Sequence, residues 1–160
     1  MSDIRRAVRA DLPALVALER EFPGDRLTRR SLRHLLTRGH ADVWVAAGGD
    51  GLLGDAVVLY RRGSCCARLY SLVVAPAARG RGIAQALMRT AEAGAAARGV
   101  ETLRLEVRCD NRAALALYAK LGYGRIERLP RYYEDGADGL RLQRRLSGSG
   151  PRRETGAHAA

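Results

Sequence analysis

The chain has 160 residues, of which 47% are hydrophobic and 28% charged, a composition typical of one globular domain rather than of a disordered polypeptide. No apolar run approaches the ~20 residues of a membrane span, and no signal peptide is recognised, so we expect a cytoplasmic protein without a membrane partner. The net charge is +11, but the arginines are spread along the whole chain, so they do not predict a specific nucleic-acid partner.

The three cysteines are Cys65, Cys66 and Cys109. Their odd number and the adjacent pair argue against a disulfide framework. Neither a CxxC nor a CxxH spacing is present, so no zinc or other metal site is expected. We expect the three thiols to be buried and inert.

Hydrophobic periodicity divides the chain into strand-like and helix-like segments. Apolar residues at helical spacing follow Gly82 over about four turns, whereas residues 102–108 alternate strictly between apolar and charged side chains. The predicted strands are 4–9, 42–47, 52–60, 68–74, 102–108, 123–127 and 139–146, and the predicted helices start at Asp11, at Thr28 or Ser31, at Gly82, and at Asp110 or Asn111.

This order of elements predicts an α/β (α+β) fold with a mixed central sheet of about seven strands and about four helices. We place a single domain at residues 1–146. Residues 147–160 contain Gly, Ser, Pro, Arg and Ala, and we expect them to form a flexible C-terminal tail.

The segment 73–84 carries the strongest chemical signal. A strand ends, a basic glycine-rich turn follows, and a long helix begins, so the free N–H groups of the first helical turn and the nearby arginines can bind a phosphate. A Walker loop is excluded because segment 73–84 contains no lysine. A dinucleotide fingerprint is excluded because Gln85 stands where its third glycine would be. The alternative is an ordinary strand-to-helix turn with two solubilising arginines.

Two motifs resemble the GCN5-related N-acetyltransferases, the GNAT superfamily. Arg79-Gly80-Arg81-Gly82-Ile83-Ala84 is similar to the family's acetyl-CoA loop, Gln/Arg-x-x-Gly-x-Gly/Ala. Residues 111–123 resemble its Asn-x-x-Ala-x-x-Leu-Tyr-x-x-x-Gly-Phe/Tyr segment. The resemblance implies the GNAT fold, with a V-shaped splay between strands 4 and 5, and acetyl-CoA as co-substrate.

A closer resemblance is to the RimI/Ard1-like branch, which acetylates protein N-terminal α-amines. Residues 103–108 match the branch's Leu-x-Leu-Glu-Val-Arg strand, and residues 131–139 resemble its Tyr-Tyr hairpin. Residues 22–25 differ from the Phe-Pro-Trp/Tyr-Ser sequence common in RimI, which leaves the exact protein substrate open.

The resemblance implies a role for individual residues. Glu106 would be the base that collects the amine's proton, and the alternative is a surface glutamate paired with Arg104 or Arg108. Tyr118 would be the acid toward the CoA sulfur, and the alternative is a core tyrosine on the helix stripe. Because a phenol of pKa ~10 is a weak acid for a thiolate of pKa ~8.5, hydrogen bonding can matter more than full proton transfer.

Acetyl-CoA and the acceptor would bind beside these two residues. Asn111 would hold the cofactor arm or act only as a helix N-cap, and Tyr132 and Tyr133 would close over the acceptor's first residues or only pack against each other. The cofactor's other expected contacts are the strand residues Leu72, Val73 and Val74 and the loop and helix residues Arg79, Gly80, Arg81, Gly82, Ile83, Ala84 and Gln85.

The expected function is therefore acetyl transfer from acetyl-CoA to a primary amine, most naturally a protein N-terminal α-amine, by a monomer or homodimer. One alternative is an acetyltransferase for a small-molecule amine or a lysine side chain. Another is a non-catalytic acetyl-CoA-binding module.

Overall fold

The computed structural model describes residues 3–22, 27–37, 39–49 and 51–146. The predicted tail at 147–160 lies outside the described residues. The strands are β1 (Asp3–Arg6), β2 (Ala41–Gly48), β3 (Gly51–Leu59), β4 (Cys66–Val74), β5 (Thr102–Arg108), β6 (Gly124–Leu129) and β7 (Gly139–Arg145), and the α-helices are α1 (Leu12–Arg20), α2 (Arg29–Thr37), α3 (Ile83–Ala97) and α4 (Arg112–Lys120).

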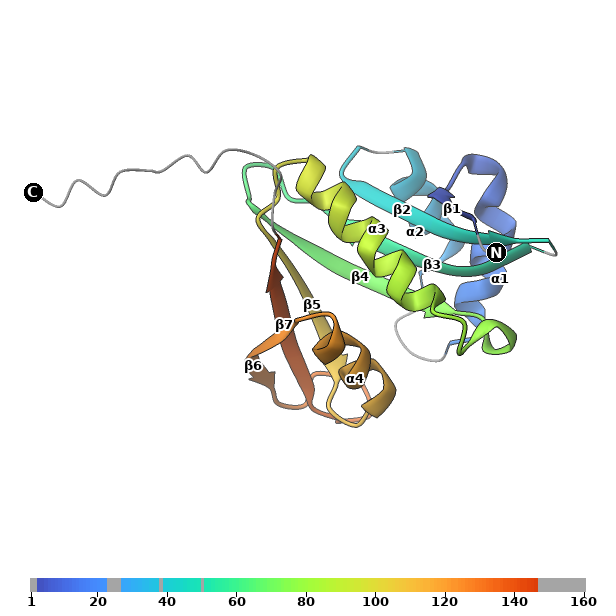
Figure 1. Ribbon diagram of the computed structural model, residues 1–160. Coiled ribbons are helices and arrows are strands. Elements are labelled where there is room, and N and C mark those ends of the chain that lie inside the picture. The colour runs from blue at the N-terminus through green and yellow to red at the C-terminus, as the bar shows by residue number, and fades with distance from the viewer. Residues whose placement is uncertain (1–2, 23–26, 38, 50, 147–160) are drawn as a thin grey trace, which may run out of the picture.

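All seven strands form one sheet in the order β1-β2-β3-β4-β5-β7-β6 (Figure 1). Only the β4–β5 pair is parallel among these strands, because the connection between the two passes through α3. The predicted mixed sheet, with its seven strands and four helices, is confirmed.

Helices cover both faces of the sheet. On one face, α3 packs Leu87, Met88 and Ala91 into a core that also contains residues of β5 and α4. On the other face, α1 and α2 bury Leu15 and Leu32 against β2 and β3. None of the helices in the described part of the chain is long and apolar enough to cross a membrane.

The sheet opens between β4 and β5. These strands pair only from Cys66–Arg68 to Thr102–Arg104, whereas the rest of β4 stays on β3 and all of β5 stays on β7. The β3–β4 register shifts so that Tyr70 is an extra residue, and such a bulge bends a strand. The expected V-shaped splay is therefore present, with Arg68 and Arg104 as the last pair before the strands diverge (Figure 1).

Candidate active site

The glycine-rich loop leads directly into the N-terminus of α3. Gly80 and Gly82 have φ angles of 80° and 75°, in the left-handed region that favours glycine. An added Cβ at either position would have no atom within 4 Å apart from those of the adjacent residues in the chain, so the loop surface is open. Gly82 is the N-cap and offers no side-chain cap, and the first turn carries no acid. The free N–H groups and the positive helix end are therefore available to an anion.

The residues of this loop differ in what they can offer a ligand. Arg79 and Arg81 are exposed, and the Arg79 guanidinium lies 5.7 Å from the centre of the Phe22 ring. Ile83 is buried, so its main-chain N–H is the group it can present. Ala84 and Gln85 are partly exposed within the first helical turn.

Leu72, Val73 and Val74 form the part of β4 that lines the splay. They pair with β3 on one side, and the β4–β5 ladder has already ended at Arg68. Alternate main-chain groups of a strand point to opposite sides, so this stretch directs polar groups away from β3. An extended ligand arm can therefore add to this strand edge.

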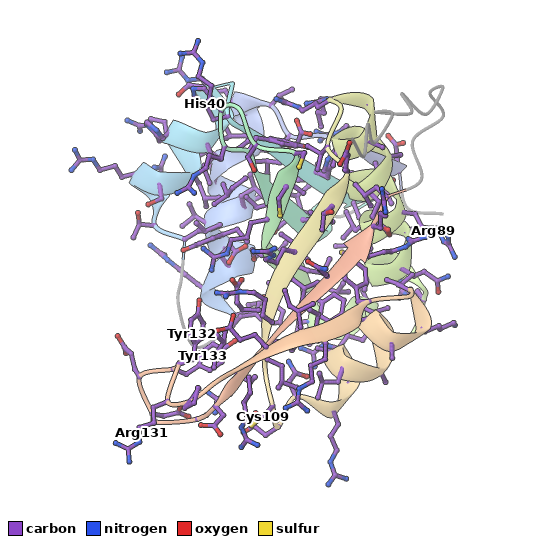
Figure 2. The ribbon with its side chains drawn as sticks, turned by 90° about the vertical axis from the view of Figure 1, so that its left-hand side faces the viewer. His40, Arg89, Cys109, Arg131, Tyr132 and Tyr133 are labelled. Carbon is purple, nitrogen blue, oxygen red and sulfur yellow. The ribbon has the colours of Figure 1, made fainter. Side chains whose placement is uncertain are left out.

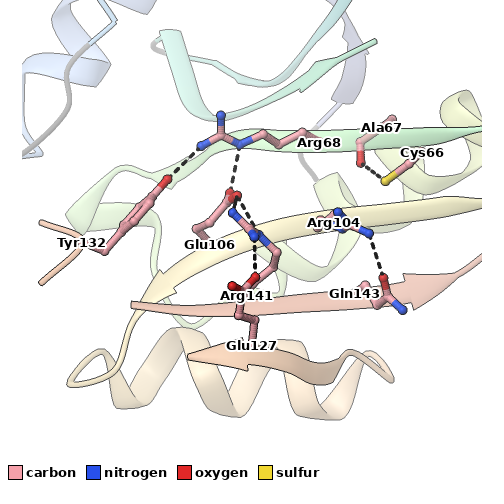
Figure 3. Close-up of polar contacts among 9 residues, drawn as sticks. All are labelled: Cys66, Ala67, Arg68, Arg104, Glu106, Glu127, Tyr132, Arg141 and Gln143. Carbon is pink, nitrogen blue, oxygen red and sulfur yellow. Dashed lines mark hydrogen bonds and ion pairs between the residues drawn. The ribbon is translucent and has the colours of Figure 1, made fainter. Parts of the chain in front are cut away.

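Glu106 lies two residues beyond the last β4–β5 pair, and its side chain is only 9% exposed. Its Oε2 accepts a hydrogen bond from Arg68 Nε at 2.9 Å, and its Oε1 accepts from Arg141 Nε and Nη2, both at 3.4 Å (Figure 3). A carboxylate has about four lone-pair sites, so Oε2 retains capacity for a further donor such as an ammonium group or a water. The neighbouring strand residues Leu105 and Val107 point into the α3 core, and Glu106 therefore lies on the opposite face.

Tyr118 lies on α4 and is 7% exposed. Its ring meets that of Tyr123 edge to face, with the ring centres 5.7 Å apart. Burial, with a smaller electrostatic contribution from Tyr133, raises the pKa of the Tyr118 phenol above its usual value. The phenol is therefore suited to donate a hydrogen bond rather than to lose its proton.

Asn111 caps α4. Its Oδ1 accepts a hydrogen bond from the Ala114 N–H at 3.1 Å, which confirms the predicted N-cap. Because Oδ1 is used in this way, the amide NH₂ group of Asn111 is the group suited to contact a ligand arm.

Tyr132 and Tyr133 lie in the loop between β6 and β7, at the end of the sheet marked by their labels in Figure 2. Their rings pack edge to face, with centres 5.1 Å apart, as the alternative of aromatic packing within the hairpin expects. Arg68 Nη2 donates to the Tyr132 hydroxyl at 3.4 Å, and the Arg108 guanidinium lies 5.1 Å from the centre of the Tyr133 ring. The loop is thus connected to both strands of the splay.

Ion pairs also hold this loop. Arg108 pairs with Asp135 at 2.6 Å, and the Asp138 carboxylate accepts from both Arg128 and the Arg131 N–H. Arg131 itself has a left-handed φ of 51°, which turns the chain just before the two tyrosines. These contacts fix the position of Tyr132 and Tyr133 relative to β5.

One alternative and one expectation from the sequence are wrong. Arg104 and Arg108 are not the partners of Glu106: Arg104 donates to Gln143, and Arg108 pairs with Asp110 and Asp135. The thiols are not buried, because the turn and loop positions at the ends of β4 and β5 leave Cys65 and Cys109 exposed and Cys66 partly exposed.

The sequence interpretation also missed residues near the splay. Arg68 and Arg141 contact Glu106 from β4 and β7, and no local pattern reveals pairs 38 and 35 residues apart. Glu19 and Asp55 are buried acids on the α1 face, and the partly exposed Ser71 donates through Oγ to Glu19 at 3.0 Å. The sequence signal that could have revealed these buried acids is Asp55, an acidic residue within the otherwise apolar strand β3.

The described residues therefore combine an uncapped helix N-terminus, an open strand edge, a carboxylate just beyond the splay and a buried phenol on α4. Residues 10–123 match the acetyltransferase (GNAT) family. The chain belongs to this family. The loop with its two left-handed glycines, the uncapped helix end and the open edge of β4 fit a phosphate-bearing cofactor with an extended arm.

Comparisons with individual proteins agree with this assignment. N-alpha-acetyltransferase MAK3 of Arabidopsis thaliana is 44% identical over 72 residues, 45% of this chain and 38% of that protein. N-alpha-acetyltransferase 30 of Schizosaccharomyces pombe is 32% identical over 101 residues, 61% of this chain and 67% of that protein. The chain thus spans between 38% and 67% of the length of these two relatives.

The fold also matches a solved structure over nearly its whole length. The ribosomal-protein-S18-alanine N-acetyltransferase of Escherichia coli superposes with a TM-score of 0.83 at 25% sequence identity, covering 95% of this chain and 98% of that chain. The predicted GNAT fold and the likeness to protein N-terminal acetyltransferases are confirmed.

Proposed function

We propose that this protein transfers the acetyl group of acetyl-CoA to the α-amine of a protein N-terminus. The observation that carries the proposal is the position of Glu106. It lies just past the point where β4 and β5 diverge and is connected through Arg68 to the Tyr132 loop. The likeness to the N-alpha-acetyltransferases supports the choice of an α-amine over other amines.

The proposed cofactor contacts follow the open surfaces of the site. The pyrophosphate would lie on the loop and first helical turn, Arg79 to Gln85, where the N–H groups at the α3 N-terminus are free of a side-chain cap. The pantetheine arm would extend along Leu72, Val73 and Val74, with Asn111 on its other side.

The proposed reaction is direct transfer between the two substrates. The amine nitrogen attacks the thioester carbonyl carbon, the new C–N bond forms, the C–S bond breaks, and CoA leaves as a thiolate. The amine's proton passes to Oε2 of Glu106, directly or through a water. An α-amine has a pKa near ~8, so an appreciable fraction is already neutral at pH 7 and only modest assistance is required.

Tyr118 would stabilise the departing thiolate. Since burial raises the pKa of this phenol, we assign it a hydrogen bond to the sulfur rather than complete proton transfer. Tyr132 and Tyr133 would cover the first residues of the acceptor, because their loop is anchored to both β4 and β5.

Initial rates with three acceptors test the proposal. They are a peptide with a free α-amine and no lysine, the same peptide with a blocked α-amine and one lysine, and a polyamine. We expect acetyl transfer to the first peptide at a kcat/KM far above the other two. A preference for the polyamine or for the lysine peptide would reject the α-amine assignment.

A further inference from the structure

A pocket lies on the α1–α2 face of the sheet, between α2 and strands β3 and β4. Its volume is about 410 Å³, within the range of roughly 300–1,000 Å³ that is typical of ligand sites. Leu27, Leu35 and Leu59 form its apolar wall, and polar groups come from Arg30 and His34 of α2 and from Tyr70 of β4. This combination of apolar and polar lining residues suits a ligand in which an apolar group is adjacent to a polar one.

The pocket is lined by basic residues. The described residues that line it include Arg30 and His34 and no aspartate or glutamate. Arg68 lies beside the pocket, with its guanidinium 5.5 Å from the centre of the Tyr70 ring, but its charge is paired with Glu106, so Arg30 supplies the pocket's positive charge. A carboxylate is therefore the complementary group for this pocket.

The pocket lies next to the candidate active site. Arg68, which lies over the Tyr70 ring, donates to Glu106 at 2.9 Å and to the Tyr132 hydroxyl at 3.4 Å. The Tyr70 wall is thus separated from Glu106 by a single intervening side chain. An extended chain advances about 3.3 Å per residue, so a peptide whose amine lies at Glu106 reaches Tyr70 within a few residues.

We propose that this pocket binds the acceptor chain two to three residues behind its N-terminal residue and selects an apolar side chain followed by an acidic one. This inference rests on the proposed function, because it assumes that the acceptor is a polypeptide N-terminus. The three leucines receive the apolar side chain, and Arg30 receives the carboxylate.

Two six-residue peptides test the proposal directly. They share every position except the fourth and carry Leu-Glu or Leu-Lys at positions three and four, with no lysine elsewhere. For the wild-type protein we expect kcat/KM for α-amine acetylation to be about tenfold higher with the glutamate peptide, the scale of one charge-assisted hydrogen bond. Arg30→Glu should abolish or reverse this preference.

Arg33→Glu is the matched control. Arg33 lies on the same helix and is exposed, but it does not line the pocket. It should keep the wild-type preference, and circular dichroism should show that both variants are folded. An equal loss of preference in both variants would indicate general attraction to a basic helix and would overturn the proposal.

A dipeptide amide separates the two levels of inference. If the wild-type protein acetylates the dipeptide and both hexapeptides with the same kcat/KM, the proposed pocket is rejected and the proposed function stands. If it acetylates none of the three, the proposed function fails, and the pocket assignment fails with it.

Discussion

Arg68 Nε donates to Glu106 Oε2 at 2.9 Å across the point where β4 and β5 separate. Arg68 belongs to the last paired position, and Glu106 lies two residues beyond the partner of that position, Arg104. The same guanidinium contacts the Tyr132 hydroxyl (Figure 3). One arginine therefore connects the candidate base, the splay and the loop proposed to cover the acceptor.

Glu106→Gln should lower kcat/KM at neutral pH, with a defect that shrinks as the pH rises toward about 9. The substitution keeps the shape of the side chain and removes its ability to take a proton. Above the pKa of the α-amine, the acceptor is neutral without help, so the variant approaches the wild type. A pH–rate profile of both proteins on one peptide measures this effect.

Glu127→Gln is the control for that experiment. Glu127 accepts from Arg141 at 2.6 Å, so its substitution removes a carboxylate from a shared arginine without changing Glu106. The control should keep the wild-type pH profile. A Glu106→Gln defect that is constant over the whole pH range would show that Glu106 positions its arginines rather than accepts a proton.

Tyr118→Phe should lower kcat by roughly 10- to 10³-fold while changing KM for acetyl-CoA little. The hydroxyl acts on a thiolate that develops only late in the reaction, so its removal affects the transition state selectively. Phenylalanine keeps the ring that packs against Tyr123. Steady-state kinetics with varied acetyl-CoA check the result.

Tyr123→Phe provides the comparison. The Tyr123 hydroxyl is buried without a hydrogen-bond partner, so its loss removes no hydrogen bond and kcat should stay at the wild-type value. Equal kcat values for wild type and Tyr118→Phe would make Tyr118 a core residue alone.

Gly82→Glu should weaken acetyl-CoA binding by roughly tenfold or more, because it adds a negative charge at the α3 N-terminus. The left-handed φ of 75° makes glutamate strained there, and a control must carry the same strain. Gly99, at the other end of α3, has a φ of 83° and equally open space. Gly99→Glu should be less stable than wild type but should keep the wild-type affinity for acetyl-CoA in calorimetry. If Gly82→Glu and Gly99→Glu bind acetyl-CoA with similar affinity, the pyrophosphate does not bind at the α3 N-terminus.

The buried carboxyl group of Asp55 should make folding less favourable as the pH rises. Burial raises the pKa of Asp55 well above its ordinary value of 3.8, and the nearby charge of Glu19 raises it further. The folded state thus retains a proton that the unfolded state loses, so stability decreases as the pH rises from about 3.8 toward the raised pKa. The slope for one proton is at most about 1.4 kcal/mol per pH unit.

Asp55→Asn removes this titration, so urea unfolding at pH 5 and pH 8 should show the variant gaining stability relative to wild type at the higher pH. Asp42→Asn is the control, since Asp42 is also buried. Burial alone would raise its pKa, but hydrogen bonds from Tyr60, Arg98 and Arg6 make the pKa lower than usual. The difference in the free energy of unfolding between Asp42→Asn and wild type should therefore be the same at pH 5 and pH 8. If the difference for Asp55→Asn is also the same at both pH values, the prediction is contradicted.

Local sequence patterns were sufficient for the order of elements. The alternation at 102–108 places Leu103, Leu105 and Val107 in the core, as observed for β5. The first strand ends at Arg6 rather than at residue 9, because Arg9–Asp11 form a 3₁₀ turn before α1. End positions depend on contacts that a periodic pattern does not contain.

The electrostatic surroundings of the site were not predictable in the same way. The partners of Glu106 come from β4 and β7, and the sheet order that places them there follows from pairing between distant strands. Arg104 and Arg108 are near Glu106 in sequence, but they are held by Gln143, Asp110 and Asp135. The loop and family motifs indicated a candidate site, and only the three-dimensional arrangement identifies the ion pairs around Glu106.

The position of the acetyl group in one peptide that carries both a free α-amine and an internal lysine tests the central claim most directly. The peptide is incubated with the protein and acetyl-CoA near pH 7, and fragmentation mass spectrometry locates the product acetyl group. The proposed function predicts acetylation of the α-amine with the lysine unmodified at early times. Acetylation of the lysine first, or no acetylated product above the rate without protein, would contradict it.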